Sequence, residues 1–373
     1  MRRTPLLAAA AALALLGSAV APAQALRAGE AEELAGGLAM PLSLAVAEDG
    51  TVYFSENFPA GEGDVPNLNA VVPGGEVELV YADEQMREVG AVSVTGDVVT
   101  FATTALGGPP SAHVYQLDTS DPAAEPVDRA NLWSMEEQVN PDGRQTYGLK
   151  GLSKSCKATI RKKKRLRPFL PYRGIVESHP YATYVDGERI FVADAAANAI
   201  FVVEGETVDT LAVLPATKIT VRKKIRKATG LPKCAQGKTL RVEGVPTDVE
   251  MGPDGNLYVT SLPGGPEIPA MGANGAIYRI APGTGAITRM SSGLVSPTGL
   301  AIGPDGTAYI SMLFAQQILA VPFGGEPSVF AEVAGGPGDV EIADGYLYAT
   351  EAGMLSETGE GKVLRRSLAS GRG

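Results

Sequence analysis

The stretch PTGLAIGPDGTAYISM, from Pro297 to Met312, contains the pattern on which the fold depends. A short apolar run is followed by an Asp-Gly pair and then by a run rich in aromatic and β-branched residues. An Asp-Gly pair between two such runs is a strong signal for a β-hairpin with a tight turn. The stretch therefore predicts two antiparallel strands joined at Asp305-Gly306.

The same pattern recurs along the chain, which indicates an internal repeat. The clear copies are PLSLAVAEDGTVYFSE from Pro41, PTDVEMGPDGNLYVTS from Pro246 and PGDVEIADGYLYATEA from Pro337. Weaker copies are PYATYVDGERIFVADA from Pro180 and VGAVSVTGDVVTFATT from Val89. Most copies are followed by a third and a fourth strand, such as QILAV (317–321) and SVFAEV (328–333). Units of four strands with a period of about 40 to 50 residues are typical of a β-propeller.

We therefore predict an all-β fold, a six-bladed β-propeller with four-stranded blades. The sixth unit lacks a fourth strand, and AEELAGG (31–37) can supply it. The N-terminal strand would then close the ring and remove an exposed sheet edge. The predicted propeller is a single domain over residues 26–373, with basic inserted links at about 140–176 and 215–244. Two smaller β domains are the alternative.

Residues 1–25 have the features of a cleavable signal peptide. Arg2 and Arg3 precede the apolar run LLAAAAALALL (6–16), and Ala23-Gln24-Ala25 matches an A-x-A cleavage site. That run is too short for a transmembrane helix, and no later stretch approaches one. The sequence therefore predicts a secreted, extracytoplasmic protein, and an uncleaved N-terminal anchor is the alternative.

Charge is distributed unevenly along the chain. Of its 32 Lys and Arg residues, ten lie in residues 150–173, the first basic segment, and nine lie in residues 218–241, the second basic segment. Neither segment contains an acid. Without these 19 residues and the two arginines of the signal peptide, 11 bases remain against 42 acids, a net charge of −31. The sequence thus describes an acidic body with two concentrated basic segments.

The two cysteines, Cys156 and Cys234, lie one in each basic segment. An even number of cysteines in an exported chain indicates a disulfide, and two free thiols are the alternative. The bond would tie both segments into one lobe. Because strands alternate in direction within a blade, the links between blades share a face with the long loops between second and third strands. Long loops on a rigid scaffold commonly bind ligands.

The dense positive charge of these segments predicts attraction to polyanions. The candidate residues are Arg161, Lys162, Lys163, Lys164, Arg165, Arg222, Lys223 and Lys224. The partner is unknown, but export favours an anionic cell-surface polymer or a phospholipid head group over nucleic acid. The alternative is intramolecular, with the basic segments lying over the acidic body and reducing its self-repulsion.

Whole units of the chain resemble the ScyD/ScyE family of exported proteins. The likeness extends over about residues 30–366 and is carried by residues 174–203, 245–267, 293–325 and 337–353. That family is similar to six-bladed propellers with NHL repeats and to SMP-30/gluconolactonase-like domains. The resemblance implies a fold and export rather than an activity, and the Lys/Arg runs depart from the family's pattern.

Likeness to gluconolactonases implies a divalent cation in the channel, where it would polarise a lactone carbonyl and activate water. At the positions where that family has an Asn ligand, this chain has Thr247, Thr298 and Gly338, which are poor ligands. Acids remain beside them in two D-V-E motifs, whose members point to one face of a strand: Asp248, Glu250, Asp339 and Glu341. Such oxygens suit Ca²⁺ or another divalent cation. Hydrated acids around a wet channel are the alternative, and no cofactor is certain.

His179 opens the first strand of the third unit and follows Glu177 by two residues. A His at this position is a candidate general base, with Glu177 as a partner, and streptogramin-lyase-like propellers use a channel His. A His hydrogen-bonded at a strand end is the alternative. Asp194 and Asn198 resemble the Asp and Asn of NHL repeats, but the Asn falls one place later, which favours capping hydrogen bonds over a ligand role.

The chain contains no G-x-S-x-G, C-x-x-C or P-loop motif. The leading hypothesis is therefore a non-enzymatic binding or interaction module. The alternative is a metal-dependent enzyme, either a lactonase-like hydrolase or a lyase, acting in the central channel.

Overall fold

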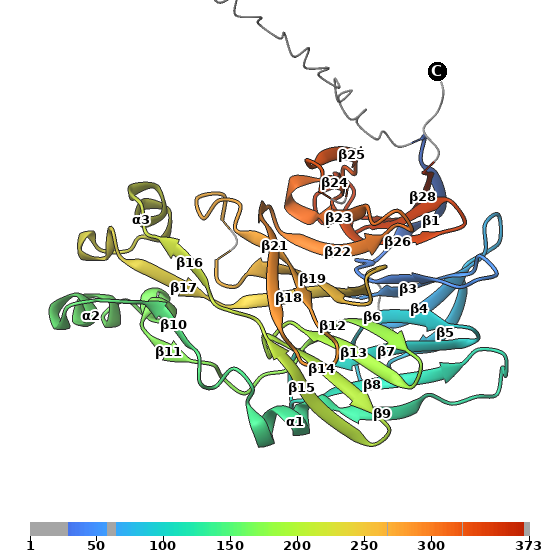
Figure 1. The fold of residues 1–373 in the computed structure, drawn as a ribbon, viewed down its shortest axis with the longest axis horizontal. Helices are drawn as coiled ribbons and strands as arrows, with labels where there is room; N and C mark the ends of the chain where they lie inside the picture. The colour runs from blue at the N-terminus through green and yellow to red at the C-terminus, as the bar shows by residue number, and fades with distance from the viewer. Residues whose placement is uncertain (1–28, 58–64, 267, 323, 369–373) are drawn as a thin grey trace, which may run out of the picture.

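The computed structural model describes residues 29–57, 65–266, 268–322 and 324–368. Within these ranges, 28 strands form seven four-stranded antiparallel sheets, together with three α-helices and three short 3-10 helices (Figure 1). No helix in these ranges is long and apolar enough to cross a bilayer. The predicted signal peptide lies outside the described residues.

The first half of the chain forms three of the sheets, each with its strands in sequence order. The first sheet contains β2–β5 (Leu44–Val46, Val52–Glu56, Asn67–Val71 and Glu78–Ala82). The second contains β6–β9 (Glu88–Thr95, Val98–Thr104, Ala112–Asp118 and Val127–Asn131). The third contains β12–β15 (Pro180–Asp186, Arg189–Asp194, Ala199–Glu204 and Thr207–Val213).

The second half forms three similar sheets. One contains β18–β21 (Gly244–Met251, Leu257–Pro263, Gly275–Ile280 and Ile287–Leu294). The next contains β22–β25 (Pro297–Ile302, Ala308–Met312, Gln317–Val321 and Ser328–Glu332), with η3 (Leu313–Ala315) after β23. The last has the order β1-β28-β27-β26 (Glu32–Leu38, Gly361–Ser367, Tyr346–Glu351 and Pro337–Ala343). The pairing of β1 with β28 confirms that the N-terminal strand completes the last sheet.

The first strands of these six sheets pack against one another in a closed series, from β2 through β6, β12, β18, β22 and β26 back to β2. The predicted all-β propeller is confirmed. The structure contains one sheet more than the six predicted units. Because the closed series links six sheets, we interpret these as the blades and the seventh sheet as an addition to the ring.

Turn chemistry explains why the repeats form hairpins. In the Asp-Gly turns, Gly50, Gly255 and Gly306 have φ values of 88°, 70° and 79°, which glycine adopts without the strain that a side chain would cause. The preceding Asp supports the turn, since Asp305 Oδ1 accepts the Thr307 backbone N–H at 2.9 Å. The predicted turns at these pairs are confirmed.

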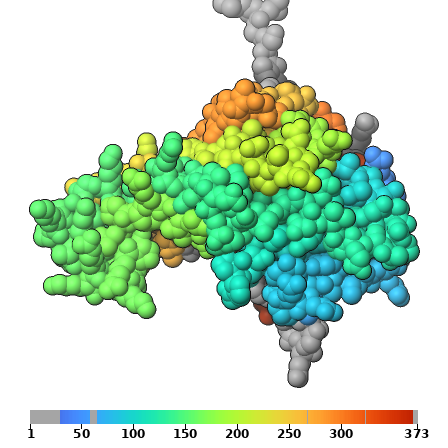
Figure 2. Space-filling model, turned by 90° about the horizontal axis from the view of Figure 1, so that it is seen from below, coloured from blue at the N-terminus to red at the C-terminus, as the bar shows by residue number. Residues whose placement is uncertain are grey.

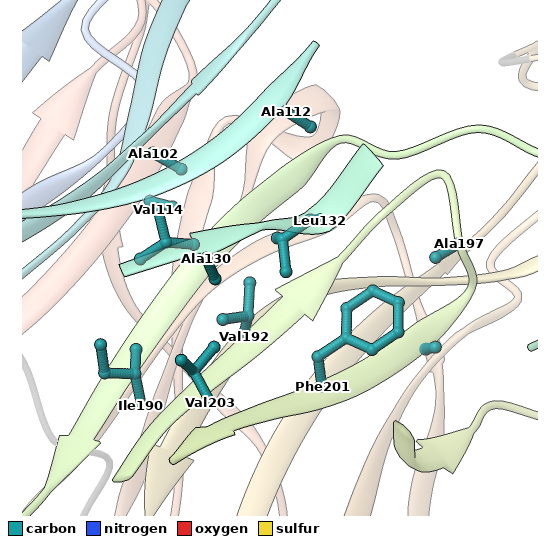
Figure 3. Close-up of a cluster of buried hydrophobic side chains, with 12 residues drawn as sticks. Ala102, Ala112, Val114, Ala130, Leu132, Ile190, Val192, Ala197, Phe201 and Val203 are labelled. Atoms are coloured by element: carbon teal, nitrogen blue, oxygen red, sulfur yellow. The ribbon is translucent and has the colours of Figure 1, made fainter. Parts of the chain in front are cut away.

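Apolar side chains between adjacent sheets form the core. Figure 3 shows the cluster between the second and third sheets, where Ala102 and Val114 lie near Val192 and Phe201. Helix α1 (Leu132–Val139) follows β9 and contributes Leu132 to the same cluster. The helix is thereby fixed to the blades at the point where the chain leaves them for the seventh sheet.

The seventh sheet is built from residues 146–173 and 217–242, which contain the two basic segments, and has the order β11-β10-β17-β16 (Tyr172–Arg173, Thr146–Leu149, Thr239–Val242 and Thr217–Thr220). It carries α2 (Lys154–Arg161), η1 (Lys164–Phe169), α3 (Lys223–Thr229) and η2 (Lys233–Ala235). We call this unit, residues 146–173 and 217–242, the cationic lobe. It projects from one side of the body (Figures 1 and 2). The segments predicted only as links therefore form a folded unit.

Candidate functional site

A disulfide and an apolar core hold the cationic lobe together. Cys156 of α2 is bonded to Cys234 of η2, with their Cα atoms 5.9 Å apart, so the predicted disulfide is confirmed. The lobe has its own cluster of buried residues, which includes Leu149, Ile160, Leu166, Ile219, Val221, Ile225, Leu231, Leu240 and Val242. Blade residue Met271 packs into this cluster. The lobe is thus a compact unit packed against a blade loop.

The local sequence separates charge from this core. In α2, Cys156 and Ile160 lie four residues apart on one helix face and are buried, while Arg161 is exposed. The chain then enters η1 with Leu166 buried among exposed bases. All eight predicted polyanion-binding residues are exposed on the lobe: Arg161, Lys162, Lys163, Lys164, Arg165, Arg222, Lys223 and Lys224.

The ion pairs of the described residues do not involve the positive charges of the lobe. Within the described residues, no Lys or Arg of residues 150–173 or 218–241 forms an ion pair with an acid. The polar contacts that these bases do make are to neutral groups, such as Arg226 Nε to Gln236 Oε1 at 3.1 Å. An intramolecular role as a cover for the acidic surface therefore finds no support in side-chain contacts.

A cavity of about 300 Å³ lies at the foot of the lobe. Arg165, Phe169 and Arg241 line it, together with Glu243, whose carboxylate accepts the Tyr172 hydroxyl. The Arg241 Nε–H is buried and has no hydrogen-bond partner within the described residues. Sequence reasoning did not single out Arg241, although the alternation in Thr239-Leu240-Arg241-Val242 is typical of a strand with one apolar face.

The four acids of the D-V-E motifs lie on the first strands β18 and β26, near enough for their charges to interact, and we call them the acidic cluster: Asp248, Glu250, Asp339 and Glu341. Burial raises the pKa of each, and the pKa of Asp248 rises further because the charges of Asp339 and Glu341 are close. Burial raises the pKa of Asp339 to about 7. Sequence reasoning missed Tyr184, whose pKa is raised by burial and by the nearby charge of Glu250.

The two aspartates of the acidic cluster bind backbone amides of the sheets. Asp248 accepts the N–H groups of Val249, at 2.7 Å, and of Leu300 in the next blade. Asp339 accepts the N–H groups of Val340, at 2.9 Å, and Leu44, at 3.0 Å. No group of three or more His, Cys, Asp and Glu side chains in the described ranges is arranged to hold a metal ion. Metal binding by the acidic cluster stays a prediction, and no chemical step is assigned to a metal.

The threonines at the positions of the lactonase-type Asn bind neighbouring blades. The Thr247 hydroxyl donates to the Pro297 carbonyl at 2.8 Å, and the Thr298 hydroxyl donates to the Pro337 carbonyl at 3.3 Å. Each bond joins the first strand of one blade to the first strand of the next. These side chains therefore have a structural explanation.

His179 lies at the start of β12 beside an acid from another blade. Its Nε2 is 3.2 Å from Glu88 Oε1, and its backbone N–H donates to Asp194 Oδ1 at 2.8 Å. The pKa of His179 is raised because the hydrogen bond to Glu88 and the charge of Glu88 outweigh burial. A raised pKa favours the imidazolium and an ion pair over a free general base. Glu177 is exposed. A catalytic role for either residue stays a prediction.

No family model and no curated protein matches the chain. Solved propeller enzymes do share its fold. The PQQ-bound aldose sugar dehydrogenase of Streptomyces coelicolor aligns over 91% of this chain and 98% of its own, with a TM-score of 0.54 and 11% identity. A gluconolactonase of Xanthomonas campestris aligns over 92% and 91%, with a TM-score of 0.52 and 12% identity. At these identities the likeness shows a common β-propeller fold and no more.

Proposed function

We propose that the chain is an exported propeller of the ScyD/ScyE type that binds an anionic cell-surface polymer through its cationic lobe. The observation that carries this proposal is that the lobe's bases form no ion pair within the described residues, although the acidic residues of the chain outnumber the basic ones. An unneutralised cluster of like charges attracts polyanions over a range of about 8 to 10 Å at physiological salt.

The build of the lobe supports binding by a preformed surface. A disulfide and an apolar core hold α2, η1 and α3 in place, so little conformational entropy is lost when a ligand binds. The cavity at its foot brings Arg165 and Arg241 together, and a guanidinium suits carboxylate, sulfate and phosphate groups. The disulfide is typical of extracytoplasmic compartments, which supports export.

Retention of the full chain on heparin, a sulfated polysaccharide, tests this proposal. We expect the triple variant Lys162→Gln, Lys163→Gln and Lys164→Gln to elute at clearly lower salt than the wild type. The control variant Arg129→Gln, Arg279→Gln and Arg289→Gln removes the same charge from the blades and is expected to elute like the wild type. Equal elution of wild type and lobe variant would contradict the proposal.

Two further probes distinguish the source of the anionic groups. Binding to heparin that exceeds binding to vesicles of phosphatidylglycerol and phosphatidylcholine supports a polymer. Preference for the vesicles would indicate that the ligand is a phospholipid head group. Preference for duplex DNA of equal charge would contradict the proposal that the lobe binds a polymer of the cell surface.

The second candidate function is acid–base chemistry in the ring centre. It is favoured by the raised pKa of the acidic cluster, since a carboxyl with a pKa near neutral can donate or accept a proton at physiological pH. A screen of simple lactones tests it. Turnover that is abolished by Asp339→Asn but retained by Asp97→Asn, an exposed turn residue, supports an enzyme; no turnover of any lactone argues against it.

A further inference from the structure

A group of oxygen-bearing side chains is buried where the chain leaves the second blade for the cationic lobe. Glu136 lies on α1, and Asn140 and Asp142 follow the helix directly. Asn198 comes from the loop between β13 and β14 of the third blade. Leu132 of α1 and Ala197 of that loop share one apolar cluster, which fixes the two elements beside each other (Figure 3).

Most acceptor oxygens of this group have no hydrogen-bond donor; the exception is Asp142 Oδ2, which accepts from the Tyr147 hydroxyl at 2.9 Å and from Asn198 Nδ2 at 2.8 Å. Glu136 is 0% exposed, and neither of its carboxylate oxygens has a partner of ordinary hydrogen-bond geometry within the described residues, although the Glu177 backbone N–H lies close enough to act on the pKa of this carboxyl. Three more buried oxygens nearby are also without a partner: Asn140 Oδ1, Asp142 Oδ1 and Asn198 Oδ1. Since nearly all buried polar groups in proteins are satisfied, five acceptors without a protein donor in one region indicate a ligand-binding site.

Contacts between these residues bring the oxygens together. Asn198 Nδ2 donates to Asp142 Oδ2 at 2.8 Å, which places its own Oδ1 beside that carboxylate. Asn140 Nδ2 donates to the Gly174 carbonyl at 3.3 Å, and Asp142 Oδ1 lies so close to Gly174 that a Cβ there would be 1.7 Å from it. Glu136 is near enough to Asp142 and Asp194 to feel both charges.

The side-chain amides of Asn140 and Asn198 are oriented with their oxygens free to bind a cation. Asn140 and Asn198 each direct the NH₂ group to an acceptor, which leaves both carbonyl oxygens without a donor. Neither Glu136 nor Asp142 forms an ion pair within the described residues. These oxygens therefore lack a positively charged group that could bind several of them at once.

We propose that Glu136, Asn140, Asp142 and Asn198 form a binding site for a hard divalent cation, with Ca²⁺ as the best match. Carboxylate and amide oxygens in an irregular arrangement are the ligands that Ca²⁺ takes, whereas Mg²⁺ demands a near-octahedral shell and keeps its waters. The site joins α1 and the 140–142 turn to the third blade, at the root of the lobe. Bound Ca²⁺ would fix the lobe to the ring.

Calcium titration of the chelator-treated full chain tests this site. We expect Ca²⁺ to bind with one-to-one stoichiometry by calorimetry and to raise the Tm by about 5 °C at a hundredfold excess over Kd. Glu136→Gln keeps the side-chain size and should weaken Ca²⁺ binding at least tenfold. Glu137→Gln removes the same charge from the next, exposed residue and should bind like the wild type.

The single tryptophan provides a local readout. Trp133 lies on α1 three residues before Glu136, so Tb³⁺ in the site should show luminescence excited through this ring. Added Ca²⁺ should displace Tb³⁺ and reduce this luminescence, and the Trp133→Phe variant should not show it. The proposal is overturned by the absence of Ca²⁺ binding, by unchanged binding in Glu136→Gln, or by loss of binding in Asp248→Asn with Asp339→Asn, which would place the cation in the acidic cluster.

Discussion

At the scale of single residues, polar groups of the first strands are engaged in joining the blades. Thr247, Thr298, Asp248 and Asp339 each bind the backbone of the next first strand in the ring. A hydrogen bond of this kind contributes about 1 kcal/mol, and more when the acceptor is charged. The aspartates thus stabilise the ring, yet their burial together opposes ionisation.

This conflict predicts a stability that depends on pH. The folded state binds a proton on Asp339 with a pKa of about 7, whereas the unfolded chain has the ordinary value near 3.8. Between these values the folded state holds more protons, so the free energy of unfolding falls as the pH rises toward 8. We expect a loss on the order of 2 kcal/mol between pH 5 and pH 8.

Urea denaturation at a series of pH values measures this loss. Asp339→Asn should reduce the slope of stability against pH, and Asp97→Asn, in an exposed turn, should leave it as in the wild type. A stability that rises with pH over this range would show that the acidic cluster is ionised in the folded state at low cost.

At the scale of elements, the sequence predicted the structures that depend on local chemistry. The Asp-Gly pairs predicted the hairpin turns, and the alternation of apolar residues predicted the strands. The first strands that contain Pro180, Pro246, Pro297 and Pro337 all show a register shift within three residues of the proline. Proline has no N–H for the ladder, which is compatible with a bulge at each strand start.

Features that depend on distant pairing were not predictable in the same way. The seventh sheet requires Gly148 to pair with Arg241, and no turn signal connects those segments. The cluster of Glu136, Asp142 and Asn198 likewise combines residues from a helix, a turn and a blade loop. The acidic cluster was predictable, because two copies of one repeat place D-V-E on equivalent strands.

Removal of the disulfide tests whether the lobe is a separate cooperative element. The Cys156→Ser, Cys234→Ser variant frees a closed loop of 78 residues, which corresponds to about 4 kcal/mol of chain entropy. We expect hydrogen exchange to accelerate in α2, η1 and α3 while the blades keep their protection. Equal acceleration in every blade would mean that the lobe and the ring unfold together.

At the scale of the whole molecule, the ring depends on a strand from each end of the chain. Strand β1 pairs with β28, and Ala35 and Leu38 enter the core cluster between the last and first blades. Arg365 and Lys362 add ion pairs to Glu32 and Glu33. The closure therefore combines backbone pairing, apolar burial and charge.

Truncation of residues 1–38 tests this closure. The truncated chain exposes the edge of β28 and part of an apolar cluster, so we expect a lower Tm and self-association through the free edge. Thermal unfolding and light scattering measure both effects. A truncated chain that stays monomeric with an unchanged Tm would show that β1 does not contribute to the stability of the ring.

The molecule also separates its charges, with 19 bases in the two basic segments and an acidic excess elsewhere. The most direct test of polyanion binding by the lobe is the dependence of the heparin binding constant on salt, from about 50 to 200 mM. We predict that binding weakens steeply with salt in the wild type, and that the slope of log K against log salt falls by about one for each lysine removed in the Lys162–Lys164 triple variant. Identical slopes for the wild type and this variant would contradict binding through the lobe.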